Sequence, residues 1–95
     1  MERRLSSRLQ NMPKIAIYST GWCTYCRAEK RFLDEKGVTY EDIDVEKDQA
    51  AARRMVQLSG QMGVPVTVIT HDDKTQVLKV GFDQSWLTTE LKLGS

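Results

Sequence analysis

The chain has 95 residues, and its 14 Lys and Arg residues nearly balance its 13 Asp and Glu residues, which gives a formal net charge of +1. A chain of this length forms one domain, and its charge balance argues against a mainly electrostatic partner, so we expect no nucleic acid and no anionic membrane surface. No apolar run approaches the roughly 20 residues that a membrane-spanning helix needs.

Residues 1–12 precede the first apolar segment and are rich in arginine. They contain no apolar stretch of the kind found in secretory signals. We therefore expect a flexible N-terminal extension over residues 1–12, one domain over residues 13–95 and a cytoplasmic protein. In a reducing compartment, two cysteines close in sequence are more typical of redox or metal chemistry than of a structural disulfide.

The first predicted strand is Lys14–Ser19, an apolar segment that follows Pro13 and ends before Gly21. A helix is predicted from about Tyr25 to Lys36, with Gly37 as its C-terminal stop. The apolar face of this helix is expected to point inward: Cys26, Ala28, Phe32 and Leu33. Its charged residues are expected on the solvated face: Arg27, Glu29, Lys30, Arg31 and Glu35.

A second strand is predicted over Val38–Val45, and its apolar positions shift phase, so we expect cover on both of its faces. Because a helix separates it from the first strand, the two strands should be parallel. A second helix is predicted over Gln49–Leu58, with Asp48 at its N-terminus and Gly60 at its end. Its inner face should carry three apolar residues: Ala52, Met55 and Val56.

Val64–Ile69 and Thr75–Val80 are predicted to form a hairpin across a polar turn at residues 71–74. After Gly81, either Asp83 or Ser85 can cap a last helix. The inward residues of this last helix should be Trp86, Leu87 and Leu91. The predicted order is βαβαββα, an α/β domain with one four-stranded mixed sheet flanked by three helices.

Both cysteines, Cys23 and Cys26, lie where the first strand leads into the first helix, with two residues between them. The free N–H groups and the positive end of a helix stabilise a thiolate, and the thiolate is the nucleophilic form of cysteine. Cys26, one turn inside the helix, should be less exposed and should act second. Two cysteines cannot complete a structural zinc site, and His71 is the only histidine, so no metal site is expected. A zinc site shared between chains and two inert core cysteines are the alternatives.

The segment Tyr18–Cys26 resembles the active-site segment of glutaredoxins. Met55–Gly60 is similar to the glutaredoxin approach to a Val-Pro pair, which is Val64-Pro65 in this chain, and Gly81-Phe82-Asp83 is similar to the segment before the last helix. The resemblance implies the thioredoxin fold, and it implies a dithiol thiol–disulfide oxidoreductase. It also implies a cis peptide bond before Pro65; an ordinary trans proline at the start of an edge strand is the alternative.

In this resemblance Cys23 is the nucleophile and Cys26 the resolving thiol. Val64 and Pro65 align the partner as an added strand. The other residues implied to line the substrate or glutathione groove are Thr20, Trp22, Tyr25, Gly81 and Asp83. The implied substrates are protein disulfides or glutathione mixed disulfides, and the implied electron donor is glutathione or thioredoxin reductase. We expect no tightly bound cofactor and a monomer.

Several residues depart from the common glutaredoxin pattern. Thr20 stands where many glutaredoxins carry a lysine. The family's paired glycines and paired acids, which hold glutathione, are reduced in this chain to Val80-Gly81 and Asp83-Gln84. Gly81-Phe82 is instead similar to the small redoxins that serve ribonucleotide reductase and are recharged by thioredoxin reductase. Trp22 would form an apolar rim suited to a protein disulfide, or else pack under the loop.

Thr24 also departs from the family pattern, because dithiol glutaredoxins commonly have a proline at this position. In the family, loss of that proline is associated with members that bridge a [2Fe–2S] cluster between two subunits through the first cysteine and glutathione. Thiolates are suitable ligands for such clusters. A glutathione-dependent cluster-binding or cluster-transfer protein is therefore the alternative function.

Overall fold

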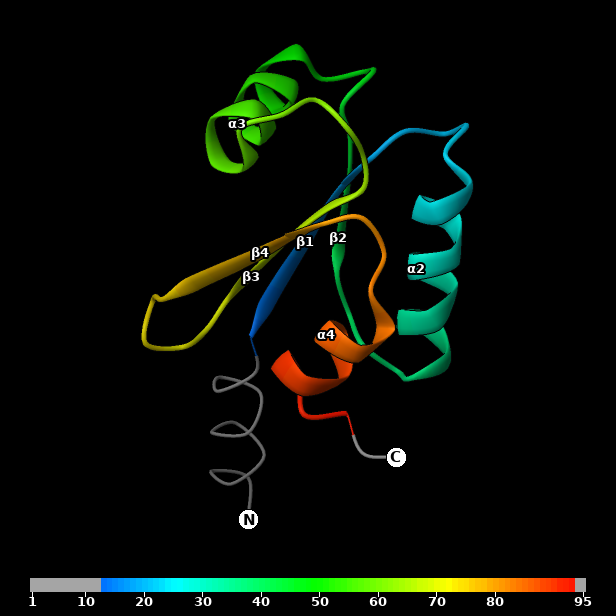
Figure 1. Ribbon diagram of the computed structural model, residues 1–95, viewed down its shortest axis with the longest axis vertical. Coiled ribbons are helices and arrows are strands. Elements are labelled where there is room, and N and C mark those ends of the chain that lie inside the picture. Colours follow the sequence, from blue (N-terminus) through cyan, green and yellow to red (C-terminus); the bar gives the residue numbers. More distant parts are fainter. Residues whose placement is uncertain (1–12, 94–95) are drawn as a thin grey trace.

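The computed structural model describes residues 13–93. These residues form four strands and three helices (Figure 1). The strands are β1 (Lys14–Ser19), β2 (Glu41–Asp44), β3 (Val66–Thr70) and β4 (Gln76–Val80), and the helices are α2 (Thr24–Glu35), α3 (Gln49–Ser59) and α4 (Gln84–Glu90). This order confirms the predicted βαβαββα arrangement. The extension predicted over residues 1–12 lies outside the described residues.

The four strands form one mixed sheet in the order β2-β1-β3-β4. β1 and β2 are parallel, as the intervening helix predicted, and β3 is antiparallel to both β1 and β4. Tyr18, near the end of β1, pairs with Val66 at the start of β3. The loop that leaves β1 and the loop that enters β3 therefore meet at the same end of the two central strands, and this end of the sheet carries the site described below.

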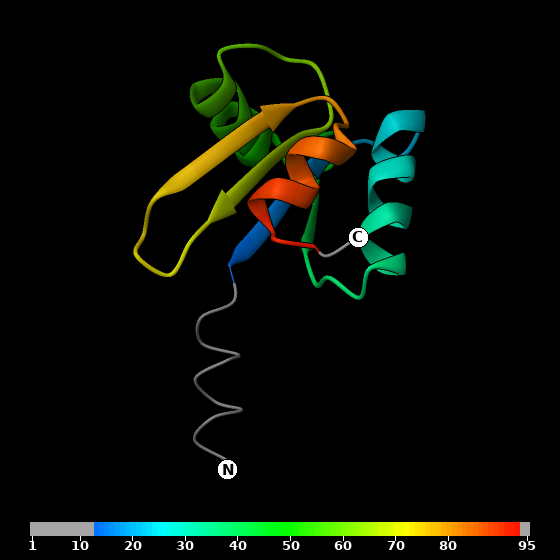
Figure 2. The same ribbon diagram turned by 60° about the horizontal axis from the view of Figure 1, so that its bottom comes forward.

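Helices cover both faces of the sheet, with α2 and α4 on one face and α3 on the other (Figure 2). The core on the α2 and α4 face consists of Ile15, Ile17, Leu33, Ile69 and Leu87. The core on the α3 face consists of Tyr18, Ala51, Met55, Val66 and Val68. Burying one large aliphatic side chain contributes about 1.5–3 kcal/mol, so these two clusters are the main attraction between helices and sheet.

Side-chain caps place the ends of the helices. Asp48 accepts a hydrogen bond from the Ala51 amide at 3.0 Å, and Asp83 accepts one from the Trp86 amide at 2.9 Å, so Asp83 rather than Ser85 caps α4. Gly60 ends α3 in the left-handed region, with φ of 74°, as predicted. None of the helices within residues 13–93 is long and apolar enough to cross a membrane.

One strand is shorter than predicted, and one prediction about a helix face was wrong. β2 covers only Glu41–Asp44 of the predicted Val38–Val45, and it is an edge strand whose first two residues are exposed. The apolar residues of the predicted segment do pack on both faces of the sheet, Val38 and Tyr40 on the α2 and α4 side and Ile43 and Val45 on the α3 side, as predicted. On α3, Ala51 is fully buried, whereas the predicted inward residue Val56 is 38% exposed. Ala51 and Met55, four residues apart, form the seam against the sheet, which turns Val56 toward solvent.

Candidate active site

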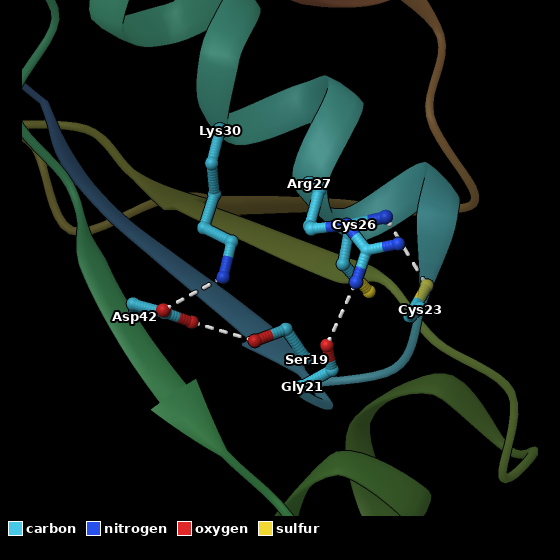
Figure 3. Close-up of polar contacts among 7 residues, drawn as sticks. All are labelled: Ser19, Gly21, Cys23, Cys26, Arg27, Lys30 and Asp42. Atoms are coloured by element: carbon cyan, nitrogen blue, oxygen red, sulfur yellow. Dashed lines mark hydrogen bonds and ion pairs between the residues drawn. The ribbon is translucent and has the colours of Figure 1, made fainter.

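The two cysteines lie at the N-terminus of α2, directly after the loop that leaves β1. Cys23 has extended backbone angles and is the N-cap of the helix, and its sulfur accepts a hydrogen bond from the Cys26 amide at 3.1 Å (Figure 3). The sulfur therefore occupies the place where a capping oxygen usually lies and receives one of the free helix N–H groups. Both cysteines are free thiols, with exposed fractions of 5% for Cys23 and 0% for Cys26.

The Cys26 thiol is held in its protonated form. Burial and a hydrogen bond with Cys23 raise the pKa of the Cys26 thiol to about 12, although a backbone hydrogen bond from Thr20 opposes the rise. Cys26 is therefore a neutral thiol near pH 7 and has to lose its proton before it can attack a sulfur atom. The order in which Cys23 attacks first and Cys26 second stays a prediction.

The peptide bond between Val64 and Pro65 is cis, as the resemblance implied. The Cys23 thiol donates to the Val64 carbonyl oxygen at an Sγ–O distance of 3.9 Å. The Gly81 amide donates to the Pro65 carbonyl oxygen at 2.8 Å. Segments that are far apart in the sequence thus meet here: Val64 contacts Cys23, and Gly81 contacts Pro65.

The rim around the buried sulfur is apolar and exposed. Trp22 is 66% exposed and Tyr25 is 68% exposed, one on each side of Cys23 in the sequence. The indole N–H of Trp22 donates to the Glu46 carboxylate at 2.9 Å, which anchors the ring to the loop before α3. Trp22 is therefore a surface residue rather than a packing residue under the loop. Met62, two residues before Val64, is 81% exposed and borders α3.

The side chains of Thr20 and Asp83 are engaged within the protein rather than open to a substrate. The Thr20 side chain is buried, with an exposed fraction of 5%, and its backbone interacts with Cys26. The Asp83 carboxylate caps α4 and lies 3.4 Å from the Lys79 ammonium group. The hydrogen bond from the Trp86 amide, together with Lys79, holds the pKa of Asp83 below its ordinary value.

A polar chain connects α2 to the edge of the sheet (Figure 3). Asp42 accepts hydrogen bonds from the Ser19 hydroxyl at 2.6 Å and from the Lys30 ammonium group at 2.8 Å. Burial opposes ionisation of Asp42, but these two hydrogen bonds outweigh it and hold the pKa of Asp42 below its ordinary value. Beside the site, the Arg27 guanidinium donates to the Gly21 carbonyl oxygen at 2.9 Å. Lys30 and Arg27 are thus bound within the chain rather than free to steer a partner.

Glu29 is the main correction to the predicted site. We predicted it on the solvated face of α2, but it is 1% exposed and accepts a hydrogen bond from the Thr67 hydroxyl on β3. Burial raises the pKa of Glu29 to about 7, although the Thr67 hydrogen bond opposes the rise. The spacing of Cys26, Glu29 and Leu33 follows one helix face, and this signal was available in the sequence.

Among residues 13–93, no three side chains of the types that bind metals lie close enough together to hold an ion. Cys23 and Cys26 are the two thiolate ligands that one chain could offer, and the Cys26 side chain is fully buried. The bridged-cluster alternative would therefore draw one thiolate, from Cys23, from each chain, with the remaining ligands supplied from elsewhere.

A family model described as glutaredoxin matches residues 15–73. The "uncharacterized glutaredoxin-like 8.6 kDa protein in rubredoxin operon" of Clostridium pasteurianum is 40% identical over 52 residues, which are 55% of this chain and 69% of that protein. The first three curated relatives are each covered over about two thirds of their length, 64% to 69%.

Solved structures match a larger part of the chain. The glutaredoxin from Archaeoglobus fulgidus has 26% sequence identity and a TM-score of 0.70, over 92% of this chain and 94% of that one. The glutaredoxin-like protein NrdH-redoxin from Escherichia coli, described as having a thioredoxin-like activity profile, has 25% identity and a TM-score of 0.67, over 80% and 92% of the two chains. The described residues therefore have the predicted thioredoxin fold.

Proposed function

Because this chain belongs to the glutaredoxin family, we propose that it is a dithiol thiol–disulfide oxidoreductase that reduces disulfide bonds in proteins. The observation that carries the proposal is the position of Cys23. Its sulfur caps α2, accepts the Cys26 amide at 3.1 Å and lies against the Val64 carbonyl group. A helix N-terminus stabilises the thiolate that exchange requires.

The reaction has two steps. The Cys23 thiolate attacks one sulfur of the substrate disulfide, the substrate S–S bond breaks, and the first substrate thiolate leaves and takes up a proton. Cys26 then loses its proton and attacks the Cys23 sulfur, which breaks the mixed disulfide and releases the second substrate thiolate. The substrate gains two electrons, and the Cys23–Cys26 pair loses them as its own disulfide forms.

The geometry of the pair supports this division of roles. Cys26 begins as a neutral buried thiol three residues from Cys23, so it is protected from outside disulfides but close to the sulfur that it has to attack. Val64, next to the cis Pro65, places its carbonyl group beside Cys23. An extended substrate segment could pair with the backbone there as an added strand.

The apolar rim favours a protein substrate over a small charged one. Trp22, Tyr25 and Met62 expose large apolar surfaces beside the Cys23 loop and the loop before Pro65. Met62 also lines a hollow of about 360 Å³ on α3, together with Ala52, Arg53, Val56 and Gln57. Exposed aromatic residues and methionine are enriched in protein–protein interfaces.

The same surface favours a protein reductase as the electron source. We expect the oxidised protein to be reduced by NADPH and thioredoxin reductase faster than by NADPH, glutathione and glutathione reductase. The assay follows NADPH loss in the two systems side by side, with insulin as the terminal disulfide. Faster turnover with glutathione would contradict this donor, and no insulin reduction in either system would contradict the proposed function itself.

The cluster-binding alternative follows from Thr24, which replaces the common proline of the family. Anaerobic reconstitution with iron, sulfide and glutathione tests it directly. A brown dimer, seen in the visible spectrum and on a sizing column, would support this alternative. A colourless monomer would leave the oxidoreductase as the function.

A further inference from the structure

Glu29 is a buried carboxyl group without a role in the two exchange steps described above. It lies three residues after Cys26 on α2, and the two side chains are 1% and 0% exposed. On a helix, residues three apart have Cβ atoms about 5–6 Å apart. Helical side chains also lean toward the N-terminus of the helix. These rules bring the Glu29 carboxyl group toward the turn that holds Cys26.

Thr67 holds this carboxyl group from the sheet. Its hydroxyl donates to Oε2 of Glu29, and both residues are 1% exposed. Thr67 lies two residues after Pro65, on the strand that continues from the segment beside Cys23. The hydrogen bond therefore connects Glu29 to the part of β3 that carries the site.

The second oxygen of Glu29 is free to accept a proton. Oε1 is buried and has no hydrogen-bond partner among the described residues. Burying an acceptor without a donor costs stability, and an apolar side chain at this position of the core would avoid the cost. A buried carboxyl group that keeps one oxygen unpaired and lies about one helical turn from Cys26 is therefore suited to chemistry rather than to packing.

Cys26 needs such a group in the second step. Its sulfur is 0% exposed, so bulk water cannot take the proton that the thiol loses when it attacks Cys23. Three close pairs of titratable side chains lie on the elements around this face: Lys30 with Asp42, Lys79 with Asp83, and His71 with Glu90 of α4. Lys79 lies on the same side of the sheet as Thr67, because the two residues are cross-strand partners.

We propose that Glu29 is the internal proton acceptor for Cys26 in the resolving step. This inference rests on the proposed function. The S–H bond of Cys26 breaks and the proton passes to Oε1 of Glu29, while the sulfur electron pair forms the bond to Cys23. The bond between Cys23 and the substrate sulfur breaks, and the substrate leaves as a thiolate. Glu29 later returns the proton to the released thiolate or to water once the site opens.

The protonation of Glu29 suits this role. Burial raises its pKa to about 7, so near neutral pH the group can both take up and release a proton. A proton acceptor is most effective when its pKa lies close to the working pH. Because the Thr67 hydrogen bond lowers the pKa of Glu29, Thr67 also tunes this acceptor.

The test uses dithiobis(nitrobenzoate), which separates the two steps in one stopped-flow trace. Attack by Cys23 releases the first coloured thiolate at a rate that depends on reagent concentration. Attack by Cys26 on the resulting mixed disulfide releases the second at a rate that does not. We expect Glu29→Gln to slow the second phase at least about 10-fold above pH 7 and to leave the first phase unchanged.

The pH profile distinguishes a proton acceptor from a structural residue. In the unmodified protein, the second-phase rate should rise with pH through an inflection near 7, in addition to the rise from direct deprotonation of the thiol. Glu29→Gln should remove this inflection, Glu29→Asp should keep it, and Thr67→Val should move it to higher pH. Glu35→Gln is the matched control, because Glu35 lies on the same helix but is exposed.

Several results would overturn the inference. The inference fails if Glu29→Gln does not slow the second phase, or if it slows both phases equally. It also fails if the second-phase rate of the unmodified protein shows no inflection near pH 7. The pH profile of the unmodified protein needs no variant, so it tests the inference even if Glu29→Gln folds poorly. Failure of the proposed function would look different, because the unmodified protein would then release no second coloured thiolate at all.

Discussion

Replacing Glu29 with glutamine should change how the stability of the fold depends on pH. The pKa of Glu29 is raised from its ordinary value of 4.5 to about 7, mainly by burial. Below pH 4.5 the carboxyl group is neutral in both the folded and the unfolded chain, and it contributes no pH dependence. Between these two values the unfolded chain has released the proton and the folded chain still holds it, so the free energy of unfolding falls as pH rises.

The size of the effect follows from the pKa difference. Each pKa unit corresponds to about 1.4 kcal/mol, so the folded chain should lose about 3 kcal/mol of stability between pH 4 and pH 8.5 through this single group. Glu29→Gln stays neutral throughout and should not show this loss. Any constant cost of the new amide cancels when the difference between variant and unmodified protein is compared at the two pH values.

Urea unfolding at pH 4 and at pH 8.5 measures this double difference. The reduced protein is kept in a phosphine reductant, and unfolding is followed by tryptophan fluorescence. With an m-value of about 1.5 kcal/mol/M, the unfolding midpoint of the variant should gain about 2 M urea relative to the unmodified protein at the higher pH. Parallel pH dependence of the two proteins would refute the reasoning and would place Glu29 in contact with water.

The other predictions concern the site and its supports. At pH 7.5, iodoacetamide should modify Cys23 at least about 100-fold faster than Cys26, whose pKa is raised to about 12; equal labelling, read by peptide mass spectrometry, would contradict this. Trp22→Ala should raise KM for a protein disulfide about 5-fold, as expected for loss of an interface aromatic worth about 1 kcal/mol, but should leave turnover of cystine unchanged; an equal effect on both substrates would argue against an apolar docking rim. Asp42→Asn should cost less than about 1 kcal/mol of stability at pH 7, because its ion pair with Lys30 is partly exposed. That cost should shrink as pH falls below 4, because protonation of Asp42 then removes the stabilisation that its ionised form provides. Unfolding of both proteins, followed as a function of pH in acid, checks the direction of this change.

Local signals were sufficient to predict most of the fold. The bounds of β1 and the capping roles of Asp48, Gly60 and Asp83 depend on neighbouring residues, and the structure confirms all of them. The bounds of β2 depend instead on how many residues of β1 it can pair with. Four pairs form, ending with Ser19 opposite Asp44, so the apolar residues before β2 do not extend the strand.

Only the part of the site that lies within one local sequence motif could be predicted. Cys23 and Cys26 are joined by one helical turn, so their arrangement could be foreseen. The burial of Glu29 depends on Thr67, which is 38 residues away, and the anchoring of Trp22 depends on Glu46, which is 24 residues away. The spacing of Cys26, Glu29 and Leu33 does indicate the buried face of α2, but the distant partners of Glu29 and Trp22 cannot be read from the periodicity of a single segment.

The roles of Cys23 and Cys26 are the central claim, and trapping of the mixed disulfide tests it most directly. Cys26→Ser and Cys23→Ser variants are reduced, mixed with insulin and separated on a non-reducing gel, and the cross-linked peptides are identified by mass spectrometry. We predict that Cys26→Ser accumulates a covalent complex through Cys23, and that Cys23→Ser accumulates none because the remaining thiol is buried and neutral. Equal trapping by the two variants, or a complex formed through Cys26 alone, would contradict the account.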